Sequence, residues 1–162
     1  MFVFFRALVY ATLFIGLLLI YLPSQILRWA GISQPASFDW PQIVAWIVGS
    51  IGALIALSCV AAFIVIGEGT PAPFDPPRRL VIRGPYRFVR NPMYLGAALA
   101  LASAALYYQS VALLVFVAGF YLVTHLFVVL YEEPTLKRSF GPDYEIYCHI
   151  VHRWWPRLRG ER

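Results

Sequence analysis

Residues 91–131 read NPMYLGAALALASAALYYQSVALLVFVAGFYLVTHLFVVLY and hold no charged side chain over 41 positions. A helix of that length would measure about 60 Å, whereas one crossing of the hydrocarbon core takes about 20 residues. We therefore predict a hairpin of two transmembrane helices, near 92–108 and 110–131. The expected turn is the polar tip Tyr107-Tyr108-Gln109-Ser110, with its tyrosines at headgroup depth.

Two further uncharged runs precede this hairpin. Residues 7–27 and 40–67 hold 21 and 28 residues without charge, which predicts helices near 6–27 and 42–66. A signal peptide is the alternative for the first run. We disfavour it because the run is longer than the usual 7–15 apolar residues and no small-x-small cleavage site follows Pro23.

The composition excludes several classes of protein. The chain of 162 residues is 60% hydrophobic and only 13% charged, about half of the roughly 25% usual in soluble domains. It is therefore not expected to be a soluble monomer, a disordered chain or a disulfide scaffold. Cys59 and Cys148 show no metal-binding or disulfide pattern. The predicted fold is all-α: one integral membrane domain over residues 1–162, with about four transmembrane helices and a C-terminal interfacial helical segment.

The basic residues predict the orientation in the membrane. Loop 68–91 and the tail 132–162 hold most of the arginines and lysines, whereas the connection between the first two helices holds only Arg28. The positive-inside rule then places both termini, the loop and the tail in the cytoplasm. Contact with anionic headgroups explains this charge better than nucleic acid does, because the basic residues lie within a few positions of the spans.

Two segments on the expected cytoplasmic face carry polar chemistry. In the first, Asn91 and Pro92 are typical of a helix start, whose free N–H groups bind carboxylate or phosphate, with Arg90 beside them. In the second, Glu132 and Glu133 follow the hairpin. Carboxylates are unfavourable at the C-terminal end of a helix dipole, which favours a binding role for this pair.

Ionisable residues elsewhere are weaker candidates. His125 lies at membrane depth, two turns before Glu132 on the same helix face. Glu68 and Asp75 belong to a proline-rich linker that is predicted to cross the cytoplasmic face in an extended form.

Together, the motifs resemble the isoprenylcysteine carboxyl methyltransferase and phospholipid methyltransferase superfamily. They are Arg90-Asn91-Pro92-Met93-Tyr94-Leu95-Gly96, Glu132-Glu133, and Phe140-Gly141-Pro142-Asp143-Tyr144-Glu145-Ile146-Tyr147. The resemblance covers about residues 80–156. It implies a membrane enzyme that uses S-adenosylmethionine, bound at the cytoplasmic end of the last helices. The implied cofactor-binding residues are Tyr86, Arg90, Asn91, Pro92, Tyr94, Glu132 and Glu133.

One departure from the superfamily bears on the chemistry. Its members commonly have histidine where this chain has Asn91, which cannot act as a base. Aromatic rings such as Tyr144 or Tyr147 suit the adenine or the sulfonium. A carboxylate or thiolate acceptor needs no general base, whereas an ammonium headgroup must first lose a proton. The candidates for this base are Glu68, His125 and one of the two glutamates, and the sequence does not choose among them.

The expected function is methyl transfer to a lipid or lipidated acceptor resident in the membrane, without a metal. Two alternatives remain. One is an NADPH-dependent reductase of the related sterol-reductase group, although no glycine-rich dinucleotide motif is present. The other is a non-catalytic multi-pass partner or transport component, which leaves Glu132 and Glu133 without a role.

Overall fold

A computed structural model describes residues 9, 12–67 and 79–156 of the chain, and this part contains helices but no strand. The elements are a π-helical segment η1 (Ile15–Tyr21), α2 (Leu22–Trp29), α3 (Trp40–Ala62), the π-helical η2 (Phe63–Gly67), the short 3-10 turn η3 (Gly84–Arg87), α4 (Pro92–Tyr107), α5 (Val111–Phe127), the π-helical η4 (Val128–Glu132), α6 (Glu133–Phe140) and α7 (Pro142–Ile150). The all-α prediction is confirmed.

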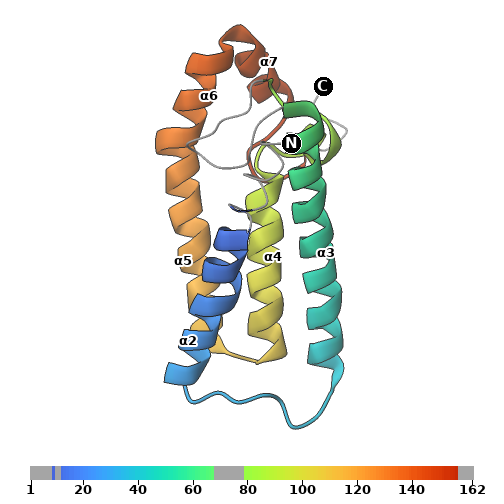
Figure 1. Cartoon of the computed structure of the whole chain (residues 1–162), viewed down its shortest axis with the longest axis vertical. Helices are drawn as coiled ribbons and strands as arrows, with labels where there is room; N and C mark the ends of the chain where they lie inside the picture. The colour runs from blue at the N-terminus through green and yellow to red at the C-terminus, as the bar shows by residue number, and fades with distance from the viewer. Residues whose placement is uncertain (1–8, 10–11, 68–78, 157–162) are drawn as a thin grey trace.

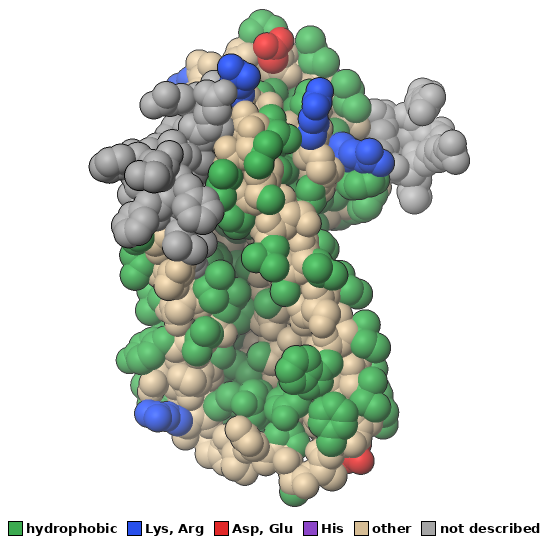
Figure 2. Space-filling model, turned by 45° about the vertical axis from the view of Figure 1, so that its right-hand side comes forward, with side chains coloured by type: hydrophobic (Ala, Val, Ile, Leu, Met, Phe, Trp, Pro, Cys, Tyr) green, Lys and Arg blue, Asp and Glu red, His purple; other side chains and the backbone are tan. Residues whose placement is uncertain are grey.

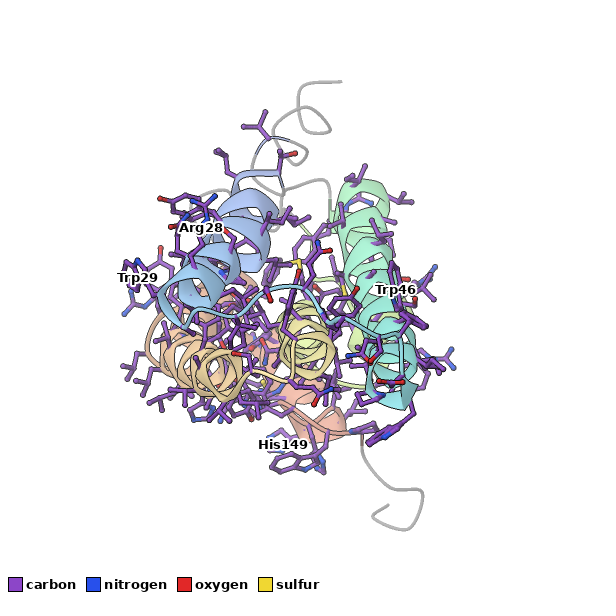
Figure 3. The ribbon with its side chains drawn as sticks, turned by 90° about the horizontal axis from the view of Figure 1, so that it is seen from below. Arg28, Trp29, Trp46 and His149 are labelled. Atoms are coloured by element: carbon purple, nitrogen blue, oxygen red, sulfur yellow. The ribbon has the colours of Figure 1, made fainter. Side chains whose placement is uncertain are left out.

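The long helices form one bundle in which α4 lies between α3 and α5, while α2 packs on α5 (Figures 1 and 3). Helix α6 continues the line of α5, and α7 turns back over the end of the bundle (Figure 1). We call this end the α7 end. The opposite end, with the connection from α2 to α3 and the turn from α4 to α5, is the hairpin end.

Three helices of the described chain are long and apolar enough to cross a membrane: Thr12–Trp29, Trp40–Gly67 and Val111–Phe140. Helix α4 is apolar but has only 16 residues, a length of about 24 Å. Three of the four predicted spans thus reach full length, and the fourth is shorter. On the face that Figure 2 shows, the middle of the described surface carries no charged side chain, and the charged side chains lie toward the two ends. Trp29 and Trp46 point away from the bundle, as expected of side chains that face lipid (Figure 3).

The predicted turn between the two hairpin helices is confirmed. Helix α4 ends at Tyr107 and α5 begins at Val111. Gln109 takes a left-handed conformation with φ of 48°, and the Ser110 hydroxyl accepts a hydrogen bond from the N–H of Leu113 at 3.2 Å. The reversal needs neither Gly nor Pro, because the left-handed residue turns the chain and the serine caps the new helix.

Glu132 and Glu133 were expected at the C-terminal end of a helix, and this expectation is wrong. Helical backbone continues through η4 and α6 to Phe140. A proline inside an α-helix removes a hydrogen bond and clashes with the carbonyl four residues earlier. Pro134 follows a π-helical segment, where the wider i to i+5 pattern changes the hydrogen-bond register before the proline. Pro23 follows η1 in the same way, so both spans pass a proline without ending.

Helices α3 and α4 approach closely through glycines. A Cβ added at Gly52 would lie 2.7 Å from the carbonyl oxygen of Gly96, and one added at Gly96 would lie 2.8 Å from that of Gly52. Small residues permit such backbone contact between helices in a membrane. This contact sets where the start of α4 lies at the α7 end.

Candidate functional site

The start of α4 lies at the α7 end of the bundle and is covered by the C-terminal part of the chain. Pro92 is the first helical residue and Asn91 precedes it, as predicted. However, the Asn91 side chain does not cap the helix. Its Nδ2–H donates instead to the backbone carbonyl of Arg153 at 3.3 Å, and the residue is buried. The asparagine thus joins two distant segments of the chain.

Glu133 forms the centre of an ion-pair cluster. Its Oε1 and Oε2 each accept a hydrogen bond of 2.8 Å, from Nε and Nη2 of Arg153 respectively. Nη2 of Arg90 lies 3.3 Å from Oε1, and Nη1 of Arg90 donates to the Sγ of Cys148. The Glu133 and Arg90 side chains are only 13% and 12% exposed, so solvent screens this pair less than a surface pair. The bidentate bond with Arg153 fixes the orientation of the carboxylate.

Glu132 points to a different partner. Its Oε2 accepts a hydrogen bond of 2.9 Å from the hydroxyl of Tyr94 in α4. The two adjacent glutamates therefore have separate environments, one bound to a neutral phenol and the other to two guanidinium groups. An acceptor with one phenol donor keeps more capacity for a further ligand than a carboxylate with two cationic partners.

Three of the tyrosines that the sequence assigned to ligands are buried in hydrophobic clusters. Tyr144 and Tyr147 of α7 form a buried cluster with Val151, and Tyr86 is buried against Cys59 and Ala62 of α3. The Tyr147 hydroxyl donates to the backbone carbonyl of Tyr86 at 2.6 Å. Burial raises the pKa of Tyr147, so its phenol stays protonated and remains a donor. This contact attaches α7 to the loop before α4.

Residues 151–156 run across the α7 end after α7, and we call them the strap. The backbone N–H of Arg90 donates to the carbonyl of His152 at 2.9 Å. Further along, the indole Nε1–H of Trp154 donates to Nδ1 of His125 in α5 at 3.0 Å. The strap is thus held on the residues just before α4, on α5 and, through Arg153, on α6.

The structure brings together most of the residues predicted to bind a cofactor. Arg90, Asn91 and Glu133 are linked through the strap and the ion pairs, and Tyr94 is bonded to the adjacent Glu132. Pro92 starts the helix, Tyr86 lies in the neighbouring core cluster, and His125 lies under the strap. Glu68 and Asp75 lie outside the described residues.

Sequence reasoning missed Arg153 and the role of Trp154. Arg153 was counted only among the basic residues of the tail, and Trp154 was given no partner. Neither residue belongs to a motif or a periodic pattern, so the sequence contained no feature that pairs them with Glu133 and His125. Among the described residues, no group of three or more His, Cys, Asp or Glu side chains is arranged to hold a metal ion.

The family model described as phospholipid methyltransferase matches residues 40–143 of this chain. The chain belongs to the phospholipid methyltransferase family. No curated protein and no solved structure matches it.

The range that matches the phospholipid methyltransferase family contains α3, the α4–α5 hairpin and α6, and ends at Asp143 in the first turn of α7. Arg90, Tyr94 and both glutamates lie inside it. The strap lies beyond it, so the contacts of Arg153 and Trp154 are observations on this chain alone. As a family member with three long apolar helices, the protein is a membrane protein of the methyltransferase type.

Proposed function

We propose that this protein transfers a methyl group from S-adenosylmethionine to a lipid or lipidated acceptor at the cytoplasmic face of the membrane. One observation carries the proposal. Arg90 at the start of α4 and the Glu132-Glu133 pair at the α5–α6 junction meet at the α7 end, in a chain of the phospholipid methyltransferase family. Cationic, carboxylate and phenol groups at one end of a hydrophobic bundle suit a zwitterionic cofactor beside a lipid.

The residues present fit S-adenosylmethionine by their hydrogen-bonding capacity. Nε–H of Arg90 is buried and has no hydrogen-bond partner in the described structure, so this donor remains for an acceptor such as a carboxylate. Glu132 accepts one bond from Tyr94 and has lone pairs left for an amine or for ribose hydroxyls. We assign the cofactor's carboxylate to Arg90 and its amine or ribose to Glu132.

When bound, S-adenosylmethionine supplies a methyl group on a positively charged sulfur that a nucleophile attacks in line. The contribution of the chain is then mainly positioning, with reacting atoms held about 3–3.5 Å apart. The hydrogen bond from Tyr94 orients Glu132, and the ion pairs orient Arg90. If the acceptor is an amine, Glu132 is the carboxylate of this cluster with the fewest cationic partners, and it is our choice to receive the proton.

The proposed orientation rests on the distribution of charge between the two ends of the bundle. Of the arginines and lysines in the described chain, Arg28 alone lies at the hairpin end; the others occupy the loop before α4 or follow Glu133. The positive-inside rule supports a cytoplasmic α7 end, and we propose that both termini lie on this side of the membrane.

Calorimetric titration of the purified protein with three ligands tests the proposal. We expect binding of S-adenosylmethionine and S-adenosylhomocysteine, and none of NADPH. Absence of binding by both adenosyl ligands would refute the methyltransferase function, and binding of NADPH alone would support a reductase. Incubation of membranes with methyl-labelled S-adenosylmethionine, followed by lipid extraction, then separates a lipid acceptor from a lipidated protein.

A further inference from the structure

Arg153 occupies about half of the hydrogen-bonding capacity of Glu133. Both carboxylate oxygens accept a guanidinium N–H of Arg153 at 2.8 Å, and Oε1 also lies 3.3 Å from Arg90. Three of the roughly four lone-pair positions of this carboxylate thus face charged donors, which leaves it little capacity for a ligand. Glu133 is therefore poorly placed to contact a cofactor, although it belongs to the motif that the sequence associates with cofactor binding.

The strap holds Arg153 in this position from both sides. Its neighbour His152 accepts a backbone hydrogen bond from Arg90, and Arg153 itself accepts one from Asn91 through its carbonyl. Trp154 is buried and bonded to His125. Arg153 and Arg90 are thus linked twice: their backbones are joined through the hydrogen bond to His152, and their guanidinium groups are joined through Glu133.

We propose that Arg153 is a positioning residue of the cofactor site. It binds Glu133, and Glu133 in turn holds the Arg90 guanidinium in position for the cofactor's carboxylate. Glu133 therefore acts through Arg90 and does not contact the cofactor itself. This inference rests on the proposed function. It assigns direct ligand contact to Arg90 and Glu132, and an indirect role to Glu133 and Arg153.

A double-mutant cycle tests the proposal, with S-adenosylhomocysteine as the titrated ligand. The four proteins are the wild type, Glu133→Gln, Arg153→Met and the double variant. Each single change is expected to weaken affinity about tenfold or more, the factor that corresponds to one hydrogen bond to a charged group. The double variant is expected to bind no more than about twofold more weakly than the weaker single variant, because residues that act through one contact are not additive. If the loss of affinity in the double variant equals the product of the two single losses, Glu133 contacts the ligand independently of Arg153, and the proposal is overturned.

A second ligand distinguishes positioning from general damage to the fold. 5′-Methylthioadenosine keeps the adenosine and the sulfur but lacks the amino-acid end that we assign to Arg90. Arg153→Met should lower the affinity for S-adenosylhomocysteine and leave that for 5′-methylthioadenosine within about twofold, the scatter expected for independent sites. Equal loss for both ligands would overturn the proposal in favour of a structural role.

Two further variants serve as controls. Arg153→Lys keeps the charge but not the bidentate geometry, so it should recover part of the affinity lost in Arg153→Met. Arg138→Met removes an exposed arginine on α6 and should bind as the wild type does. If Arg153→Met binds S-adenosylhomocysteine as tightly as the wild type does, only the positioning role is refuted. If the wild-type protein itself does not bind S-adenosylhomocysteine, the proposed function is refuted as well.

Discussion

The indole of Trp154 donates a hydrogen bond of 3.0 Å to Nδ1 of His125. Because an indole nitrogen can only donate, Nδ1 must be the unprotonated nitrogen of the imidazole, and Nε2 carries the hydrogen of the neutral ring. The lone pair that a general base would use is therefore engaged in holding the strap on α5. We expect His125 to anchor the strap rather than to remove a proton from the acceptor.

The first prediction follows from this bond. His125→Gln retains a side-chain oxygen that can accept from Trp154, so the initial rate of methyl transfer should stay within about threefold of the wild type. Loss of a general base costs about 100-fold or more. The assay uses membranes and methyl-labelled S-adenosylmethionine, with Trp154→Phe as the variant that removes the indole N–H donor and keeps an aromatic ring. A 100-fold loss in His125→Gln with a normal rate in Trp154→Phe would make the histidine catalytic.

The second prediction concerns Glu132 and Tyr94. Glu132→Gln should weaken binding of S-adenosylhomocysteine at least tenfold, because it removes the charge that we assign to the cofactor's amine or ribose. Tyr94→Phe removes only the hydrogen bond of 2.9 Å that orients the carboxylate, and its effect should be smaller. Calorimetric titration measures the affinity of both variants for S-adenosylhomocysteine. Equal affinity in Glu132→Gln and the wild type would mean that this glutamate has no contact with the ligand.

The third prediction concerns the contact between α3 and α4. Gly52→Ala and Gly96→Ala each place a methyl group within 3 Å of a backbone carbonyl oxygen of the other helix, which cannot move as a side chain does. Overpacking of this kind should destabilise the protein by about 1–3 kcal/mol. Gly119 in α5 is the matched control, since nothing lies within 4 Å of an added Cβ there. Gly119→Ala should be neutral or stabilise the helix by up to about 1 kcal/mol.

Thermal unfolding in detergent measures these three glycine variants side by side. A melting temperature of Gly52→Ala or Gly96→Ala equal to that of Gly119→Ala would contradict the close helix contact. Because α3 positions the start of α4, the two destabilised variants should also bind S-adenosylhomocysteine more weakly than the control.

The fourth prediction tests the orientation in the membrane. Ser33 lies in the connection at the hairpin end and Ser139 lies in α6, and both are exposed. In a background with Cys59→Ala and Cys148→Ser, Ser33→Cys should react with a membrane-impermeant maleimide in intact cells. Ser139→Cys should react only after permeabilisation. The reverse pattern would place the α7 end, and the site, on the outer side.

The helices of this protein were largely predictable because the spans are long, uncharged and separated by polar residues. The α4–α5 turn at Tyr107–Ser110 and the start of α4 at Pro92 agree with the sequence-based expectation. The sequence also predicted a C-terminal helical segment, which the structure divides at Gly141 into α6 and α7. The sequence did not predict that the helix continues past Glu132, because a π-helical segment before a proline produces no signal in the hydrophobic periodicity.

The sequence by itself determined that the chain is a helical membrane protein and which residues are available for chemistry, since burial in lipid requires uncharged runs and leaves few polar groups. It could not determine how those groups pair. Asn91, which looked like a helix cap, binds the strap, and Glu133, which looked like a ligand, binds Arg153. Only the tertiary structure decided this, because ion pairs and hydrogen bonds between distant segments depend on where the backbone returns, and local sequence does not encode that position.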